Sequence, residues 1–313
     1  MSAHDYHEVL HHLKLESVYY SRSVMGGRDW GVDVPAESGV SMFHVVVAGR
    51  CIVEINGHSF ELCAGDLLFI SRACGHVVKG RHDAEARCLL DLPVKKVSDF
   101  YETLTMYPEV DDKTIVLCGV VKLLHPVGEM LLRDMPDLIH MKEDEHLFGQ
   151  MMGDVVRLMF REASGEFIGG ETVITRLADI LLIQTIRHWV EHAGSSKGQW
   201  LNALQDEQIG RALASIHAEP EKPWTIESLG RVAGMSRTAF SNRFCALLGE
   251  PVFRYLTKWR MNLAVMRIRS GESVDMDFVE SLGYTSESAF RRAFKKTVGS
   301  NVSEIRRQGS AVF

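Results

Sequence analysis

The sequence predicts an α+β protein of two domains: an N-terminal β-barrel followed by helices, and an all-helical C-terminal domain. Its 313 residues are too many for one typical domain and enough for two that each bury a core. Short runs rich in β-branched residues lie early in the chain, and one helical pattern occurs twice near its end. We therefore expect domains over residues 1–192 and 201–313, with residues 193–200 as the linker.

The composition bounds the class of protein. Hydrophobic residues make up 46% and charged residues 24%, as in a soluble globular protein. No apolar run approaches the roughly 20 residues that span a bilayer, and the polar, His-rich start lacks the apolar segment of a signal peptide. The six cysteines form no CxxC pairs, which suits reduced thiols. We expect a cytoplasmic protein without membrane contact.

The charge is divided unevenly between the two predicted domains. Residues 201–313 hold 16 Lys and Arg against 12 Asp and Glu, a balance of +4, which leaves −10 for the rest of a chain whose overall charge is −6. This pattern favours contact between the C-terminal part alone and a polyanion.

From about Val18 to Leu92 the chain has the pattern of short strands separated by turns. Asn56-Gly57 joins two β-rich runs and is the strongest short hairpin signal. Gly65-Asp66 marks another turn before the apolar strand Leu67–Ile70. Closely spaced short strands of this kind predict a sandwich or a small barrel.

The order of these features resembles a cupin. His44 lies in an early strand, and His76 lies in a turn after the hairpin and Gly65-Asp66. Cupin enzymes usually carry an HxH pair and a Glu in the first motif, whereas His44 is followed by Val45 and Val46. This departure argues against a metal-dependent oxygenase or isomerase, and we expect no enzyme activity.

Histidines and cysteines of the predicted barrel allow three interpretations. His44, His76 and Cys118 form a candidate ligand set for Zn²⁺ or another divalent metal, although no cofactor is certain. Cys74, Cys88 and Cys118 are candidates for a redox switch. The alternative is that these are core cysteines and hydrogen-bonded histidines, because cysteine is among the most buried residue types. We interpret Cys51, Cys63 and Cys245 as packing residues.

Two amphipathic stretches between Glu145 and Glu191 predict long helices. They either cover the barrel or pair with a second subunit, which would make the protein a homodimer. The apolar positions at helical spacing are Leu147, Met151, Val155, Leu158 and Met159 in the first stretch, and Ile174, Leu177, Ile180 and Leu181 in the second.

The C-terminal domain contains one pattern twice. AGMSRTAFSNRFCALLG starts at Ala233 and LGYTSESAFRRAFKKTVG starts at Leu282, and both have the order helix, polar turn, helix and Gly. They predict helix-turn-helix motifs over about 225–249 and 274–299, joined by a long helix over Pro251–Ile268. Two such motifs at a fixed distance suggest a protein that reads two adjacent DNA segments.

The two predicted reading helices differ in chemistry. The first presents side chains that can bond bases in the major groove: Arg237, Thr238, Ser241, Asn242 and Arg243. The second is more basic, and its cations suit phosphates. Its outward residues are Ser286, Glu287, Ser288, Arg291, Arg292, Lys295 and Lys296. Taken alone, such a charge run is more often a solvated helix face.

On these motifs, residues 199–308 closely resemble the DNA-binding domain of AraC/XylS-type transcriptional regulators, and residues 18–192 look like the cupin-type sensor half of one branch. The resemblance implies two units that enter successive major grooves and a sensor half that binds an effector and often dimerises. We also expect promoter DNA and RNA polymerase as partners and favour an activator, with repression as the alternative that the sequence leaves open. Two departures from the family pattern, Asp277-Phe278 and Asn301-Val302 with Ile305, lead us to expect weaker packing or DNA affinity in the second unit.

Overall fold

The computed structural model describes residues 15–37, 39–72, 74–99, 101–123, 126–142, 146–164, 167–192 and 198–310. Most of the expected linker, residues 193–197, lies outside them. The chain divides into two compact units, which we name the barrel unit (Leu15–Leu123 and Met135–Ser195) and the helical unit (Leu124–Asp134 and Ser196–Phe313, with the first 14 residues). Within the described ranges no helix is long and apolar enough to cross a membrane.

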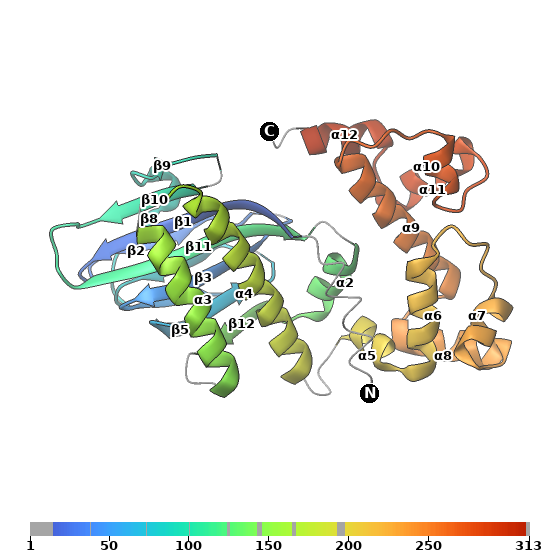
Figure 1. Cartoon of the computed structure of the whole chain (residues 1–313), viewed down its shortest axis with the longest axis horizontal. Coiled ribbons are helices and arrows are strands. Elements are labelled where there is room, and N and C mark those ends of the chain that lie inside the picture. Colours follow the sequence, from blue (N-terminus) through green and yellow to red (C-terminus); the bar gives the residue numbers. More distant parts are fainter. Residues whose placement is uncertain are drawn as a thin grey trace. The chain divides into compact units, whose positions relative to one another are not determined.

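The barrel unit consists of two sheets (Figure 1). One has seven strands in the order β12 (Leu138–Met141), β6 (Leu67–Ile70), β3 (Ser41–Ala48), β11 (Lys113–Leu123), β1 (Leu15–Gly26), β10 (Tyr101–Met106) and β9 (Lys95–Lys96). The other has five, in the order β5 (His58–Cys63), β4 (Arg50–Ile55), β7 (His76–Lys79), β2 (Gly31–Val34) and β8 (Arg87–Cys88).

The predicted hairpin is present between β4 and β5. Ile55 pairs with His58, and the two residues between them, Asn56 and Gly57, have φ angles of 51° and 76°. With positive φ at both central positions, the twist of the turn matches the twist of the flanking strands. Asn-Gly adopts this backbone conformation at a low cost in free energy. Strand β6 spans the predicted residues Leu67–Ile70.

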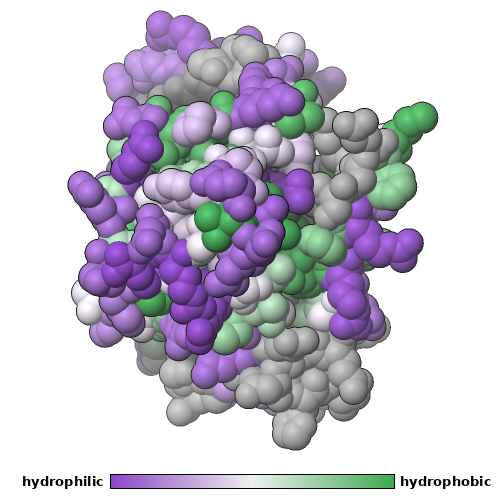
Figure 2. All heavy atoms as spheres, turned by 90° about the vertical axis from the view of Figure 1, so that its left-hand side faces the viewer, coloured by the Kyte–Doolittle hydropathy of each residue, from purple (hydrophilic) through white to green (hydrophobic). Residues whose placement is uncertain are grey.

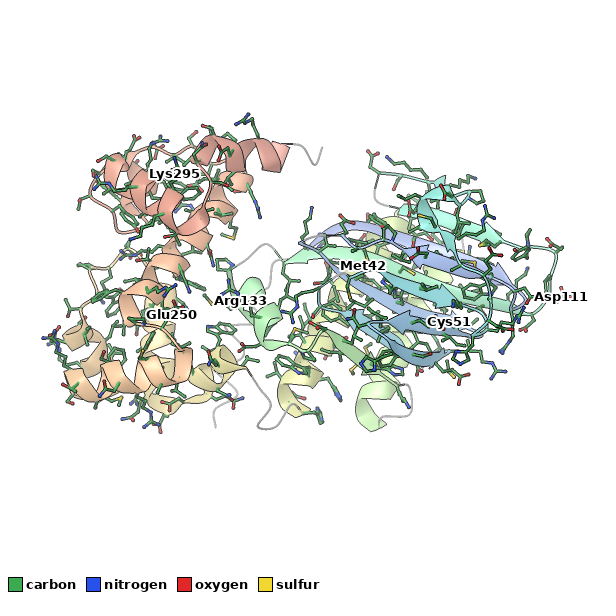
Figure 3. The ribbon with its side chains drawn as sticks, turned by 180° about the vertical axis from the view of Figure 1, so that it is seen from behind. Met42, Cys51, Asp111, Arg133, Glu250 and Lys295 are labelled. Carbon is green, nitrogen blue, oxygen red and sulfur yellow. The ribbon has the colours of Figure 1, made fainter. Side chains whose placement is uncertain are left out.

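The barrel core lies between the sheets. Met42 on β3 and Cys51 on β4 are both buried and lie among the strands in Figure 3. Most of β3 is buried on both faces, because one face meets the other sheet and the other is covered by α3 (His146–Ser164), with α4 (Gly170–His192) beside it over β1 and β12.

The predicted helical stretches are helices, and their expected apolar faces are confirmed in part. The side chains of Leu147 and Met151 lie outside the described part of the chain. Buried apolar positions include Met152, Val156 and Met159 on α3 and Ile174, Leu177 and Leu181 on α4. Leu158 and Ile180, expected on the same faces, point outward with exposed fractions of 41% and 43%. Side chains prone to association therefore remain on the outside of this helix pair.

The strands beyond Leu92 were largely missing from the sequence-based expectation. Strand β10 pairs in parallel with β1, with Tyr20 opposite Tyr101. A parallel pair cannot be joined by a tight hairpin, so no local turn signal indicates it. The long strand β11 pairs with both β1 and β3 and thereby places Cys118 opposite His44.

The helical unit contains the predicted pair of helix-turn-helix motifs. Its helices are α2 (Pro126–Asp134), α5 (Gln199–Gln205), α6 (Glu207–Ala218), α7 (Ile226–Ala233), α8 (Arg237–Leu248), α9 (Val252–Arg269), α10 (Met276–Glu280), α11 (Glu287–Val298) and α12 (Val302–Ser310). Thr225 and Ser228 form a capping box at α7, and the hydroxyls of Ser236 and Ser286 cap α8 and α11 as predicted. Gly249 and Gly299 end these two helices in the left-handed conformation.

Helix α2 packs within the helical unit, although we expected its residues in the sensor half. The Asp134 carboxylate accepts a hydrogen bond from the Leu201 backbone N–H at 2.9 Å, which satisfies a free donor at the start of α5. Any side chain at Gly198 would collide with Asp134. The Met130 sulfur lies 3.7 Å from the buried hydroxyl of Tyr255 on α9.

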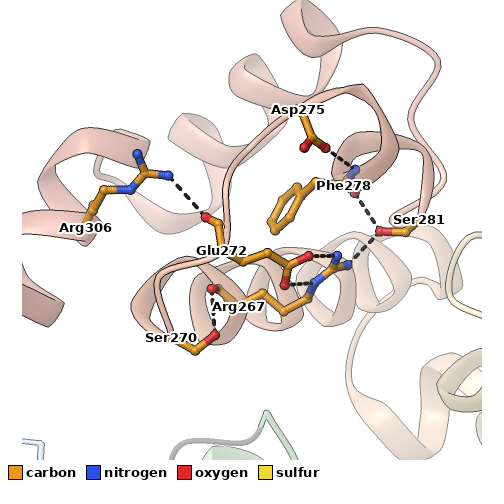
Figure 4. A network of polar contacts seen from close by, with 7 residues as sticks. All are labelled: Arg267, Ser270, Glu272, Asp275, Phe278, Ser281 and Arg306. Atoms are coloured by element: carbon orange, nitrogen blue, oxygen red, sulfur yellow. Dashed lines mark hydrogen bonds and ion pairs between the residues drawn. The ribbon is translucent and has the colours of Figure 1, made fainter.

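The residues of the second motif that depart from the family pattern make defined contacts in the structure. Phe278 is buried, contacts Phe290 edge to face and lies 4.4 Å beneath the Arg267 guanidinium, which also binds Glu272 and Ser281 (Figure 4). Asn301 and Glu304 cap α12 reciprocally, with N–H···O distances of 2.8 and 2.9 Å. The unusual residues thus contribute to the core and cap the last helix, which argues against weakened packing. Weaker DNA affinity of the second unit stays a prediction.

Candidate functional sites: two reading helices and a cavity in the barrel

The outward face of α8 carries the residues predicted for DNA reading. Phe240 and Phe244 are fully buried and fix the rotation of the helix. Arg237, Thr238, Asn242 and Arg243 are consequently exposed, and Ser241 is half-buried at the edge of this face.

Both arginines on this face already meet carboxylates of the same unit. Arg237 Nη1 lies 2.9 Å from Glu227 Oε1, and Arg243 donates from Nε and Nη2 to Asp206 Oδ2 at 2.9 and 2.6 Å. Asp206 also caps α6 by accepting from the Ile209 N–H. Although burial opposes it, these hydrogen bonds hold the pKa of Asp206 below its ordinary value.

Arg243 is exposed, as expected, but it is already bound to a carboxylate of its own unit. Its guanidinium holds the start of α6 instead of projecting freely beside Asn242. The partner lies 37 residues earlier in the chain, so no local pattern could have indicated the contact.

Helix α11 presents a more basic surface. Phe290 and Phe294 are buried, which leaves Arg291, Arg292, Lys295 and Lys296 exposed. Only Arg291 meets a carboxylate within the described part of the chain, that of Glu287 one turn earlier at 3.2 Å. Ser286 uses its hydroxyl to cap the helix at Ala289 N–H and so has a structural role. Figure 3 shows Lys295 among the exposed side chains of this motif.

The barrel brings together the three residues predicted as metal ligands. Cys118 on β11 lies opposite His44 on β3, and His76 begins β7 of the other sheet. His44 Nδ1 is 2.9 Å from Cys118 Sγ, His44 Nε2 is 2.7 Å from His76 Nε2, and His76 Nδ1 is 3.0 Å from the Cys74 carbonyl oxygen. The three side chains form a row with His44 in the middle.

The hydrogen positions in this row follow from its last acceptor. A carbonyl oxygen only accepts, so the hydrogen of His76 is on Nδ1 and its Nε2 is an acceptor. His44 must then donate from Nε2 and accept at Nδ1, which leaves the Cys118 thiol as the donor to His44. Burial lowers the pKa of both imidazoles, so both rings are neutral at pH 7.

This arrangement does not fit a single-ion metal site. The two ring nitrogens of His44 point in different directions, one to Cys118 and the other to His76, so the three donors share no common point. Among the described residues, no group of three or more His, Cys, Asp or Glu is arranged to hold an ion. The three candidate ligands are adjacent, as expected, but as a hydrogen-bonded row.

A cavity of about 50 Å³ lies inside the barrel beside this row. His44 and Cys118 form part of its wall, and the surface that Cys118 retains faces it. Burial raises the pKa of the Cys118 thiol to about 12, partly offset by a hydrogen bond from Ser21. The rest of the wall is mainly apolar, including Met25, Trp30, Val32, Met42, Leu104 and Val116.

The other cysteines occupy varied positions. Cys74 and Cys88, the further redox candidates, are half-buried, and Cys74 supplies the carbonyl that holds His76. Of the three cysteines interpreted as packing residues, Cys51 is buried, whereas Cys63 and Cys245 are exposed, so the prediction was wrong for those two. Cys245 is exposed because it is one residue beyond the inward-facing Phe244.

Two family models match the chain, one described as "Cupin" over residues 7–191 and one as "Helix-turn-helix domain" over residues 229–308. Similar proteins include an uncharacterized HTH-type transcriptional regulator of Haemophilus influenzae, 27% identical over 88% of both chains. The HTH-type transcriptional regulator AlkR of Acinetobacter baylyi is 26% identical over 90% of this chain and 92% of its own. The RCS-specific HTH-type transcriptional activator RclR of Escherichia coli is 24% identical over 90% of this chain and 89% of its own.

Among solved structures, ToxT from Vibrio cholerae bound to (E)-4-(8-methylnaphthalen-1-yl)but-3-enoic acid is 12% identical, with a TM-score of 0.38 over 94% of this chain and 99% of that one. A transcriptional regulator from Chromobacterium violaceum with an AraC-type DNA-binding domain is 20% identical, with a TM-score of 0.31 over 33% and 91%.

Proposed function

Since the chain belongs to the AraC family of helix-turn-helix transcription regulators with an N-terminal cupin domain, we propose that a signal received in the barrel cavity controls how α8 and α11 bind promoter DNA. It is a regulator and not an enzyme, as are its relatives. The observation that carries the proposal is the pair of outward-facing reading helices, each fixed by two buried phenylalanines.

The two helices have different tasks in this proposal. Thr238, Ser241 and Asn242 on α8 have short polar side chains that bond base edges, and Asn pairs with adenine in a bidentate manner. On α11, Arg292, Lys295 and Lys296 are exposed cations, and cations neutralise phosphates whatever the base sequence. The first unit supplies specificity, and the second anchors the protein to the DNA backbone.

A base-by-base scan of the bound site tests this division. Asn242→Ala is expected to relax specificity at one or two positions at a cost of about 1–3 kcal/mol, because one bidentate contact is lost. Lys295→Ala is the matched control and should weaken binding to all site variants alike. Equal sensitivity of both half-sites to base changes, or an unchanged profile for Asn242→Ala, would contradict the division.

The remaining partners are part of the same proposal. The exposed Leu158 and Ile180 on α3 and α4 favour a homodimer. Figure 2 shows hydrophobic residues interspersed with hydrophilic ones on one face of the molecule. Leu158→Glu together with Ile180→Glu should shift the protein from dimer to monomer in analytical ultracentrifugation; a mass unaffected by the double change excludes this surface. We also propose that the protein lies in the cytoplasm and acts on RNA polymerase as an activator. The similar protein RclR is named a transcriptional activator.

A further inference from the structure

The row from Cys118 to His76 joins two spaces on opposite sides of the barrel wall. Cys118 and His44 line the internal cavity. His76 lines an open depression on the outside, together with Asp33, Glu54 and His58. The hydrogen bonds run in one direction only, from the Cys118 thiol to His44, from His44 to His76 and from His76 to a backbone carbonyl.

From this geometry we propose that Cys118 is a covalent modification site for a small uncharged electrophile that enters the cavity, and that the two histidines carry the thiol proton away. The inference deepens the proposed function by naming the chemistry of its signal. It rests on that function only for the effect on DNA, because the modification itself can be measured alone.

The reaction balances through groups that are present. As sulfur attacks, the thiol proton passes to His44 Nδ1, and the hydrogen on His44 Nε2 passes to His76 Nε2. His76 becomes an imidazolium, and the nearby Asp33 carboxylate favours that charged form. With an α,β-unsaturated aldehyde, a carbon–sulfur bond forms at the β-carbon, the C=C π bond breaks, and a proton from water completes the α-carbon. The hydroxide that remains takes the added proton from His76, which becomes neutral again. The product is a thioether and needs no oxidant.

With a hydroperoxide as the electrophile, the same proton transfer gives a different product. Sulfur takes the terminal oxygen as the O–O bond breaks, and the alcohol leaves with a proton. Cys118 is oxidised to a sulfenic acid, and the hydroperoxide is reduced. Both reagents share one requirement, a thiol that can lose its proton inside an apolar cavity.

The cavity restricts the size and polarity of the reagent. Its volume of about 50 Å³ is roughly a third of the ~150 Å³ at which an apolar cavity accepts benzene. A molecule of about four non-hydrogen atoms therefore fits, whereas a phenyl ring does not. Because the wall is mainly apolar, ionised reagents are excluded by the cost of desolvation. Without the row the thiol would be inert, since the thiolate is the reactive form.

The test measures modification of each cysteine in the full-length protein by mass spectrometry over time. Acrolein and methyl hydroperoxide serve as the two small reagents, and cinnamaldehyde serves as the oversized one. Cys118 should react with one or both small reagents and not with cinnamaldehyde. The exposed Cys63 should react with all three and calibrates their reactivity.

Three substitutions examine the row. His76→Gln keeps an acceptor for His44 but cannot take the proton, and it should slow Cys118 modification on the order of 100-fold, the usual contribution of a general base. Asp33→Asn, at an exposed position, should slow it about twofold. His58→Gln is the matched control because it lines the same depression outside the row, and it should leave the rate unchanged.

The outcomes decide the proposal. Unchanged Cys118 modification in His76→Gln, tested in protein with wild-type thermal unfolding, overturns it, as does stoichiometric zinc that is lost in Cys118→Ser. If His76→Gln does not fold, Asp33→Asn becomes the deciding variant, and a rate equal to that of wild type overturns the relay. Modified wild-type protein should bind promoter DNA with altered affinity while Cys118→Ser does not respond; modification without any effect on DNA contradicts the proposed signal and leaves the chemistry standing.

Discussion

The two helix-turn-helix units share a frame and differ in the charges on it. In both, a serine caps the reading helix, two phenylalanines anchor it and a left-handed glycine ends it. On α8 each arginine is matched by a carboxylate from another part of the same unit. On α11 three of the four cations have no ion pair in the described structure.

The repeated pattern therefore encodes a scaffold and not a binding mode. The buried residues recur because the packing of helix on helix recurs. The exposed residues are released from that constraint. The two arginines of α8 are neutralised by carboxylates outside the helix, whereas most of the positive charge of α11 is not. A neutral reading face must gain its affinity from matched hydrogen bonds, whereas a basic face gains it from any phosphate.

Removing the anchors should have the strongest consequence. Phe244→Ala and Phe294→Ala each delete a fully buried ring and should destabilise their unit by about 3–5 kcal/mol. Footprinting of each variant should lose protection of one DNA segment and keep the other. Chemical denaturation followed by circular dichroism reports the stability. If either change abolishes both footprints, the units are not separable and the comparison fails.

A smaller loss is expected at Asp206, which holds both α6 and Arg243. Asp206→Ala should cost about 1–2 kcal/mol, since it removes a helix cap. Because its pKa is lower in the folded state, the stability it contributes is complete above the ordinary pKa of Asp and is lost as the pH falls through the folded pKa.

Acid unfolding curves therefore check this assignment. The wild type should lose stability below about pH 4 more steeply than Asp206→Asn, which has no proton to gain. Identical slopes for the two proteins would show that Asp206 does not have this role. Arg243→Ala should leave DNA specificity unchanged, in contrast to Asn242→Ala.

The salt dependence of DNA binding separates the two faces further. Arg292→Ala and Lys295→Ala should each reduce the slope of log K against log salt by about one, because each removes a phosphate contact. Asn242→Ala should leave the slope as it is. Fluorescence anisotropy titrations at several salt concentrations measure it. Equal slopes for all four proteins would remove the anchoring role from α11.

The smallest effect on DNA binding is expected from breaking the ion pair between Arg237 and Glu227. Both side chains are more than half exposed, so the pair contributes little to stability. Glu227→Ala should nevertheless strengthen DNA binding by less than about fivefold, because it frees Arg237 and removes a negative charge near the phosphates. Glu287→Ala is the matched change on α11. Weaker binding by Glu227→Ala would show that the pair positions Arg237 for DNA.

Much of the fold was predictable because its signals are local. The caps at Ser236 and Ser286, the Asn56-Gly57 hairpin and the strand Leu67–Ile70 each depend on a few adjacent residues, and the structure has them where they were expected. The outward faces of α8 and α11 follow from the spacing of their phenylalanines.

Features built from distant residues could not be predicted in this way. Strand β10 pairs with β1 from about 80 residues away, without a hairpin to mark it. The partners of Arg243 and Cys118 lie 37 and 74 residues away. The sequence indicated that His44, His76 and Cys118 belong together. Whether they bind a metal ion or form a hydrogen-bonded row is decided by the direction of each ring nitrogen. That direction depends on how the strands are aligned.

Helix α2 bears on how this protein can be divided. It is connected through the chain to β11 and β12 of the barrel unit, yet its apolar residues Val127, Met130 and Leu131 are buried and it packs on α5 and α9 of the helical unit. A protein cut at the linker would leave α5 without the carboxylate of Asp134 and uncover the surface on which α2 packs. The two domains therefore cannot be exchanged between proteins by a cut at the linker. A DNA-binding domain fused to another sensor domain must include residues 126–134.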